Sequence, residues 1–320
     1  MHIIVTGSIA FDYLMSFPGH FTDHLLMERV GKVSLSFLVD EMRRVRGGCA
    51  ANIAYNLGLL GEHPYMMATA GQDFETYRSW LESHGVNTSL TRTIPEVFTA
   101  SFFVNTDLDQ NQIATFYTGA MAYARELSFH TLAQRPDLVI ISPNDPEAMD
   151  KYAAECKALH IPYIYDPGQQ VVRVSADSLR LGLEGADILI LNDYEFELLK
   201  TRTGLTDAQI RATVKRAVII TRGADGSDIW TDKRITVPVF PPQQIADPTG
   251  VGDAYRAGLI KGLALDLPWE VCGRIGALAA TYTLECVGPQ SQNYSLDEFS
   301  ARYREQFGED AFTKIMSQES

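Results

Sequence analysis

Short runs of β-branched and other apolar residues alternate with helix-length stretches along this chain, and no other feature constrains its fold as strongly. The runs are Ile3–Thr6, Leu138–Ser142, Tyr163–Asp166, Ile188–Leu191 and Val218–Thr221. Strands separated by a helix pair in parallel, because the helix carries the chain back across the face of the sheet. The alternation therefore predicts an α/β core built on a mainly parallel sheet.

Two segments follow a different pattern. Lys32–Leu38 and Phe98–Tyr117 alternate apolar with polar residues, and the second contains the polar turn NTDLDQNQ. Such alternation is typical of half-exposed antiparallel strands, with a hairpin at the turn. Because no linker rich in Pro, Gly or Ser separates these segments from the rest, we expect one large layered domain with a small β appendage.

Composition excludes several classes of protein. The 46% of hydrophobic and 21% of charged residues exclude a chain that is disordered throughout. Lysine and arginine number 27 and aspartate and glutamate 40, so the net charge is 27 − 40 = −13. This charge argues against a broad basic face for a long nucleic acid, but it leaves room for a small anionic ligand held by local features.

No stretch approaches the roughly 18 consecutive apolar residues that indicate a membrane-spanning helix. The amino terminus, MHIIVTGSIAFD, lacks the basic start and small-residue cleavage site of an export signal. The 4 cysteines are widely spaced without a CxxC pair, which argues against a disulfide framework or a structural zinc site. We therefore expect a cytoplasmic protein that binds neither membrane nor nucleic acid.

The segment Asp247–Gly258, DPTGVGDAYRAG, is the richest in chemistry. Its glycines lead into a helix pattern, and the unpaired N–H groups of a helix start can hold a phosphate or a developing oxyanion. Asp253 would lie in the first turn, where an aspartate also simply stabilises the helix dipole. The segment lacks the third glycine of a dinucleotide-binding fingerprint, and no GxxxxGK[ST] string occurs in the chain.

Other polar segments allow both a functional and a structural interpretation. Arg46–Gly61 carries glycines and alanines into a helix, with Asn52 one turn in, where it could contact a ligand or serve as a cap. Asn192 and Glu195 follow a strand with the spacing of a capping box. The turn TRGADG, residues 221–226, suits a phosphate or a plain turn.

All of these segments lie at helix starts or at the carboxyl ends of expected parallel strands, where open α/β sheets bind ligands. Together they resemble the ribokinase-like, PfkB-type carbohydrate and nucleoside kinases. The resemblance runs from Ile3 to about Gln292, and its signatures are residues 47–61 and DPTGVGDAYRAG. VTGSIAFDYLMSFPG, KVSLSFLVD and YDPGQQ are similar to the bacterial adenosine kinases of this branch.

This resemblance implies a three-layer α/β sandwich with a mainly parallel central sheet and a small antiparallel β lid. It makes residues 1–320 one kinase domain, with the lid formed by about 13–45 and 97–118. It assigns Asp253 as the base for the acceptor hydroxyl, with the backbone N–H groups of Gly250, Val251, Gly252 and Asp253 as an anion hole.

The resemblance also implies ligand contacts. Asn192 and Glu195 would hold hydrated Mg²⁺ and the ATP phosphates, and Thr221, Gly223 and Gly226, together with Gly252, would contact the nucleotide. Asp12, Gly48 and Asn52 would bind the ribose. The other acceptor-pocket residues would be Ser8, Ser36, Phe102, Phe116, Gln169, Gln170 and Arg173, although Phe102 and Phe116 also suit core or interface packing.

Some positions depart from the family pattern. Cys49 stands where ribokinases carry a lysine, which disfavours ribose itself as the acceptor, and Val251 replaces the usual small alanine. The family often binds a monovalent cation, and Asp247, Thr249, Cys286 and Gly288 occupy the comparable segments. K⁺ is therefore a second candidate ion after Mg²⁺.

We thus expect an ATP-dependent phosphotransferase in which adenosine and ATP give AMP and ADP, a purine salvage reaction. The lid would close over the acceptor and exclude water. A kinase for another ribosyl or sugar compound is the first alternative, and a non-catalytic nucleotide-binding regulator ranks lower. The expected partners are small-molecule substrates, and the resemblance is compatible with a homodimer formed through the lids.

Overall fold

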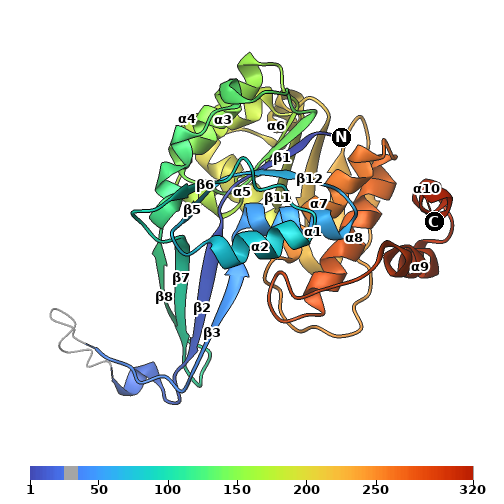
Figure 1. The fold of residues 1–320 in the computed structure, drawn as a ribbon. Coiled ribbons are helices and arrows are strands. Elements are labelled where there is room, and N and C mark those ends of the chain that lie inside the picture. The colour runs from blue at the N-terminus through green and yellow to red at the C-terminus, as the bar shows by residue number, and fades with distance from the viewer. Residues whose placement is uncertain (25–34, 320) are drawn as a thin grey trace.

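The computed structural model describes residues 1–24 and 35–319 and confirms the α/β class. Its main sheet has 8 strands in the order β14-β13-β12-β11-β10-β9-β1-β4 (Figure 1). Neighbouring strands from β4 to β12 pair in parallel, whereas the β12–β13 and β13–β14 pairs are antiparallel. The strands are β1 (Ile3–Thr6), β4 (Tyr65–Met67), β9 (Leu138–Ile141), β10 (Tyr163–Tyr165), β11 (Ile188–Asn192), β12 (Ala217–Thr221), β13 (Ser227–Trp230) and β14 (Arg234–Val237). Each predicted strand of the core therefore exists, within one residue at its ends.

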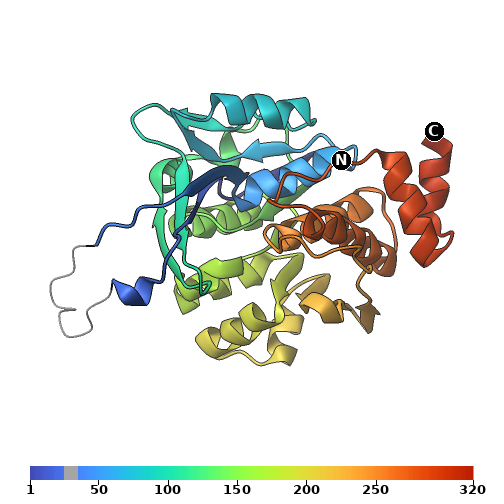
Figure 2. The same ribbon diagram turned by 90° about the horizontal axis from the view of Figure 1, so that it is seen from below.

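Helices cover both faces of this sheet, because side chains alternate between two apolar cores along each strand. One core holds Ile3 and Val5 and the other holds Ile4. The first face carries α1 (Cys49–Leu59), α2 (Glu75–Ser83), α7 (Val251–Ala264) and α8 (Trp269–Leu284), and the second carries α3 (Pro146–Ala158), α4 (Ala176–Gly185), α5 (Asp193–Thr203) and α6 (Asp207–Thr213). The chain ends with α9 (Leu296–Phe307) and α10 (Ala311–Glu319), beside α8 (Figure 2).

Shorter elements connect these layers. A two-stranded sheet joins β5 (Thr69–Gly71) to β6 (Arg92–Ile94), and the 3-10 helices are η1 (Phe21–Asp23), η3 (Gly119–Glu126), η4 (Phe129–Thr131), η5 (Gly168–Val172) and η6 (Gly223–Asp225). Within the described part of the chain, none of the helices has the length and apolar character needed to cross a membrane.

A separate four-stranded sheet projects from the body of the molecule (Figure 1). Its strands are β2 (Ala10–Ser16), β3 (Glu41–Gly47), β7 (Ala100–Thr106) and β8 (Gln112–Tyr117), in the order β3-β2-β7-β8. The outer pairs are antiparallel and the central pair β2–β7 is parallel. The predicted hairpin at Phe98–Tyr117 is confirmed as β7 and β8.

The strand predicted at Lys32–Leu38 is wrong where it can be compared: residues 35–38 are not in a strand, and residues 32–34 lie outside the described residues. The first partner of β2 is instead Glu41–Gly47. Long-range contacts explain this strand, because the guanidinium of Arg44 lies 3.6 Å from the ring centre of Phe11 and that of Arg46 lies 4.4 Å from the ring of Trp80.

Helix α7 is fixed in place by close packing against α8. A Cβ atom at Gly258 would lie 2.6 Å from the carbonyl oxygen of Ile275, and one at Gly262 would lie 2.7 Å from the Cα of Cys272. Only glycine allows the two backbones to approach this closely. The packing matters for the site because the first turn of α7 carries Asp253.

We expect Gly258→Ala to lower the free energy of unfolding by about 1–3 kcal/mol, because the contacted atoms are backbone and cannot move aside. Alanine is intrinsically the better helix residue by roughly 1 kcal/mol, so a net loss of stability would mean that the clash outweighs this gain. Urea titration would measure it, with Thr201→Ala at an exposed position of α5 as the control. Equal stability of the Gly258→Ala protein and the wild type would contradict this view of the helix packing.

Candidate active site

A cavity of about 690 Å³ opens at the carboxyl ends of the parallel strands, between the main sheet and the base of the projecting sheet. Parallel strands gather their carboxyl ends at one edge, so segments far apart in sequence meet there. The residues predicted from the sequence that line it are Ser8, Asp12, Gly48, Asn52, Phe102, Phe116, Gln169, Gln170, Arg173, Asn192, Glu195, Thr221, Thr249, Gly250, Gly252 and Asp253.

Several predicted residues do not line this cavity. Ser36 is exposed and does not border the cavity. Gly226 has a packing role, because a Cβ there would lie 2.2 Å from the carbonyl oxygen of Val237, whereas Gly223 has open space around it. The others outside the cavity lining are Val251, Asp247, Cys286 and Gly288.

The glycine turn before α7 places Asp253 at the helix start. Gly250 is the N-cap with a left-handed φ of 79°, which a side chain would disfavour, and α7 begins at Val251. Asn52 Nδ2 donates to Asp253 Oδ2 at 2.8 Å, and Gln290 Nε2 donates to Asn52 Oδ1 at 2.9 Å. Burial raises the pKa of Asp253, while Arg256 and the Asn52 hydrogen bond oppose the rise. The carboxylate is thus oriented by an amide that is itself held.

At another wall of the cavity, Asp12 extends from β2. A Cβ at Gly47 would lie 2.5 Å from Asp12 Oδ2, so glycine on the paired strand makes room for this carboxylate. Burial, with a smaller contribution from Asp247, raises the pKa of Asp12 to about 6. A buried carboxylate of this kind favours ligands that donate hydrogen bonds to it, such as vicinal hydroxyls.

The start of α1 closes the cavity between these carboxylates. Gly48 has φ +95° and lies so close to Ser8 that a Cβ there would be 2.6 Å from the Ser8 carbonyl oxygen. The Cys49 N–H donates to Ser8 Oγ at 3.1 Å. Burial, with the nearby carboxylates, raises the pKa of the Cys49 thiol, so this position contributes no charge.

Phe102 and Phe116 are direct cross-strand partners on β7 and β8 and both line the cavity. Phe116 is 36% exposed, so it is not a core residue of the projecting sheet. The neighbouring Phe103 lies outside the cavity lining and stacks on Tyr13 with ring centres 4.6 Å apart. Successive side chains of a strand point to opposite faces, so the cavity face presents the Phe102–Phe116 pair.

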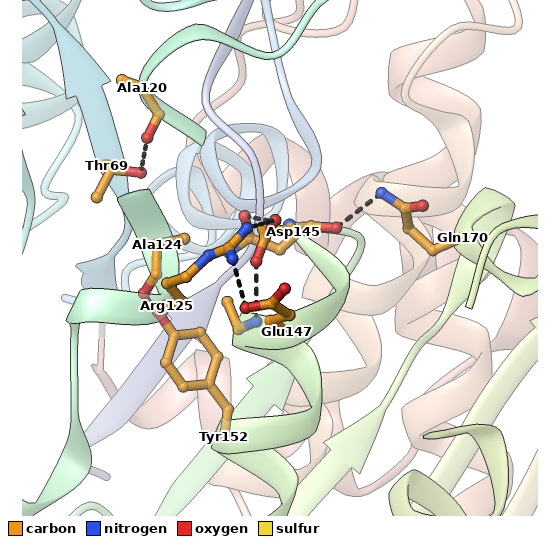
Figure 3. A network of polar contacts seen from close by, with 10 residues as sticks. Thr69, Ala120, Ala124, Arg125, Asp145, Glu147, Tyr152 and Gln170 are labelled. Carbon is orange, nitrogen blue, oxygen red and sulfur yellow. Dashed lines mark hydrogen bonds and ion pairs between the residues drawn. The ribbon is translucent and has the colours of Figure 1, made fainter. Parts of the chain in front are cut away.

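Polar contacts hold the segments η3 and η5, which carry the cavity-lining residues Met121 and Gln170 (Figure 3). Gln170, in η5, donates through Nε2 to the carbonyl oxygen of Asn144 at 2.7 Å. Thr69 Oγ1 donates to the Ala120 carbonyl oxygen at 2.7 Å and Tyr152 OH donates to that of Ala124 at 2.5 Å, which fixes η3 and its cavity-lining Met121. Nearby, Arg125 bridges Asp145 at 2.8 Å and also contacts Glu147.

Asn192 and Glu195 form the predicted capping box at the start of α5. Asn192 Oδ1 accepts from the Glu195 N–H at 2.7 Å, and Glu195 Oε2 accepts from the Asn192 N–H at 3.0 Å. Both residues also line the cavity, so the structural interpretation does not exclude the functional one. The cap uses Oε2 of Glu195, so the other carboxylate oxygen takes no part in the cap while the residue lines the cavity.

The cavity also contains a buried ion pair that was not predicted from the sequence. Arg256 Nη2 donates to Asp166 Oδ1 at 2.6 Å, Nε contacts Oδ2, and the two residues are 8% and 1% exposed. Burial acts to lower the pKa of Arg256, but the Asp166 carboxylate outweighs it and raises that pKa, so the guanidinium stays charged. A signal existed: Arg256 lies three residues after Asp253 on the same helix face, and Asp166 is the last residue of a predicted strand.

Comparisons with known proteins agree with this geometry. The model of the pfkB family carbohydrate kinases matches residues 10–295. The nucleoside kinase of Methanocaldococcus jannaschii is 30% identical over 308 residues, which cover 94% of this chain and 96% of that protein. Another nucleoside kinase, from Methanothermobacter thermautotrophicus, is 28% identical over 96% of each chain.

Solved structures give the same result. A nucleoside kinase of Burkholderia thailandensis in complex with inosine superposes with a TM-score of 0.85 at 35% identity, covering 96% of this chain and 98% of that chain. These relatives are named nucleoside kinases and not specifically adenosine kinases, so the family is shown and the finer resemblance is not. This chain belongs to the PfkB family of carbohydrate and nucleoside kinases.

Proposed function

We propose that this protein is an ATP-dependent nucleoside kinase that phosphorylates the 5′-hydroxyl of a purine nucleoside, with adenosine as the first candidate acceptor. The observation that carries the proposal is the composition of one cavity: a carboxylate at a glycine-flanked helix start, a second carboxylate suited to a diol, and a pair of phenylalanines. The nucleoside kinase relatives, one of them solved with inosine, support the same substrate class.

The reaction balances with the residues present. The 5′-oxygen forms a bond to the γ-phosphorus of ATP, its proton passes to the Asp253 carboxylate, and the bond from phosphorus to the β-phosphate oxygen breaks with its electron pair leaving on ADP. Phosphoryl transfer needs mainly positioning and charge stabilisation. The N–H groups of residues 250–253 would supply part of that stabilisation at the helix start.

The donor set fits hydrated Mg²⁺. Glu195 and Asn192 offer oxygen ligands at the cavity wall, and Mg²⁺ usually keeps several waters and accepts few protein carboxylates. Bound there, the ion would neutralise phosphate charge. For a monovalent cation such as K⁺, Asp247 is the organising residue: its carboxylate accepts from the Thr249 N–H at 2.8 Å and the Gly288 N–H at 2.9 Å.

The projecting sheet would act as the lid, because it brings Phe102 and Phe116 to the mouth of the cavity. Closure would place a purine base between these rings and the cavity wall and exclude water. Nucleotide contacts through Gly223, contacts from Ser36, and pairing of lids into a homodimer stay predictions. Exposed apolar side chains on the sheet, such as Ile113 and Tyr117 at 44% and 42%, are compatible with such pairing.

The substrate class is tested by kcat/KM for adenosine, inosine, 2′-deoxyadenosine, ribose and fructose, measured as ADP release. We expect the purine nucleosides to be preferred over ribose, because base–aromatic stacking contributes about 1–3 kcal/mol. Phe116→Ala should remove most of that preference, whereas Phe103→Ala, on the opposite face of the sheet, should not. Ribose or fructose matching the nucleosides would instead indicate a sugar kinase, and no turnover of any acceptor would indicate a binding protein.

The role of Asp253 is tested by Asp253→Asn, which keeps the shape and removes the proton acceptor. We expect kcat to fall by about 10²–10⁴-fold while ATP binding, measured by calorimetry, is retained. Asp177→Asn is the matched control, since Asp177 also lies in the first turn of a helix but outside the cavity lining. Near-normal turnover by the Asp253→Asn protein would mean that another group receives the proton.

The role of Asp12 predicts a pH dependence of acceptor binding. The pKa of Asp12 is about 6, so the carboxylate that accepts from the ribose diol predominates above that pH and is protonated below it. We expect the Kd of adenosine to rise about tenfold between about pH 7.5 and about pH 5. The Asp12→Asn protein should bind weakly with no such slope, and an equal slope in both proteins would exclude Asp12 as its source.

A further inference from the structure

The cavity lining is dominated by carboxylates, although a kinase must bring a highly charged nucleotide to it. Asp12, Asp166, Glu195 and Asp253 border the cavity. Its lining holds two arginines, of which Arg173 is exposed and Arg256 is 8% exposed. One buried cation therefore faces these carboxylates, and its position decides where positive charge is available.

The geometry of Arg256 shows where that charge points. Nε and Nη2 face the two oxygens of Asp166, which occupies one edge of the guanidinium. The remaining nitrogen, Nη1, lies toward the glycine turn, because a Cβ at Gly252 would be 2.8 Å from it. The hydrogen bond from Nη2 and the ion-pair contact of Nε restrain the planar guanidinium on one edge, which leaves Nη1 beside the helix start.

This position coincides with the turn whose N–H groups were assigned to the anion hole. Arg256 is on the same helix as Asp253, three residues later, and thus beside the carboxylate that would take the acceptor proton. The transferred phosphoryl group must pass between that carboxylate and the departing ADP. Its transition state spreads charge over equatorial oxygens, and a fixed guanidinium donor there is well suited to stabilise it.

We propose that Arg256 is a further catalytic residue, whose Nη1 contacts the transferred phosphoryl group, and that Asp166 is the positioning residue that holds it. This inference rests on the proposed kinase function and adds a residue to the transfer step described above. Glycine at position 252 makes room for this nitrogen, because a methyl group there would displace Nη1.

The alternative is a purely structural ion pair that neutralises charge in a crowded acidic cavity. Arg256→Lys separates the two roles. Lysine keeps a positive charge within reach of Asp166, so the buried carboxylate stays paired, but it has one nitrogen and cannot also present a donor to the glycine turn. A structural pair tolerates this change, and a contact to the phosphoryl group does not.

The experiment measures kcat and the KM values for ATP and adenosine with the full-length protein. For Arg256→Lys we expect kcat to fall by about 10²-fold or more, with both KM values changed by no more than about threefold. Glu62→Gln is the matched control: it breaks the other buried pair of α7, Glu62–Lys261 at 2.8 Å, outside the cavity lining, and should lower the melting temperature without lowering kcat.

A second measurement does not depend on turnover. Fluoroaluminate with ADP and adenosine mimics the planar phosphoryl group, and its binding should tighten the wild-type complex but not that of Arg256→Lys, while ADP alone binds both equally. Asp166→Asn, which loosens the clamp and keeps the arginine, should show a smaller fall in kcat with unchanged KM values. If the Arg256→Lys protein does not fold, the Asp166→Asn protein is measured in its place.

The outcomes are distinct. Wild-type transfer to adenosine with kcat of Arg256→Lys within about threefold of wild type would overturn the role of Arg256 and leave the kinase function intact. A fall in kcat without loss of fluoroaluminate binding would assign Arg256 a structural role. An unchanged kcat in Asp166→Asn would remove the positioning role, and absence of transfer by the wild type to any acceptor would overturn function and inference together.

Discussion

The hydrogen bond from Asn52 to Asp253 joins the starts of the two glycine-rich helices, α1 and α7, across 201 positions of sequence. It can form only because both helices lie on the same face of the sheet, with α7 pressed against α8 by Gly258 and Gly262. Gln290, which follows α8 in the chain, donates to Asn52 Oδ1 and so orients the Asn52 amide with its Nδ2 toward Asp253. The position of the proposed base therefore depends on the packing of the whole helical layer.

Charge is the second constraint on this site. Burial raises the pKa values of both Asp12 and Asp253, so each carboxylate favours a partner that donates a hydrogen bond or carries a positive charge. Asp12 lies on a strand of the projecting sheet, whereas the Asp166–Arg256 pair lies beside the glycine turn, so the two carboxylates meet different parts of the cavity. The acidic composition of the chain is compatible with nucleotide binding, because the N–H dipoles of the glycine turn and the charged guanidinium of Arg256 supply local positive potential at this part of the cavity.

Strand β7 of the projecting sheet presents side chains to two different faces. Phe102 lines the cavity and Phe103 stacks on Tyr13 outside it, so one residue of register separates a cavity-lining side chain from a packing contact. The parallel pairing of β2 with β7 ties the strand that bears Asp12 to the strand that bears Phe102, which are direct partners. Any movement of this sheet would therefore shift Asp12 and Phe102 as one unit.

The sequence alone determined what depends on local pattern. The five core strands, the start of α7 with Asp253 in its first turn and the Asn192–Glu195 capping box follow from apolar periodicity, glycine placement and short-range hydrogen bonds, and all are present. Most candidate site residues meet in one cavity for a similar reason, since strand direction fixes which chain ends share an edge of the sheet.

Tertiary structure decided what depends on partners distant in sequence. The strand paired with β2 is Glu41–Gly47 and not the apolar alternation before it, and its Arg44 and Arg46 contact aromatic rings of Phe11 and Trp80 from other segments. The pairing of Asp166 with Arg256, 90 positions apart, has no local signature that distinguishes it from two surface charges. The burial that raises the pKa of Asp12 is a property of the assembled layers, and no short segment of sequence contains it.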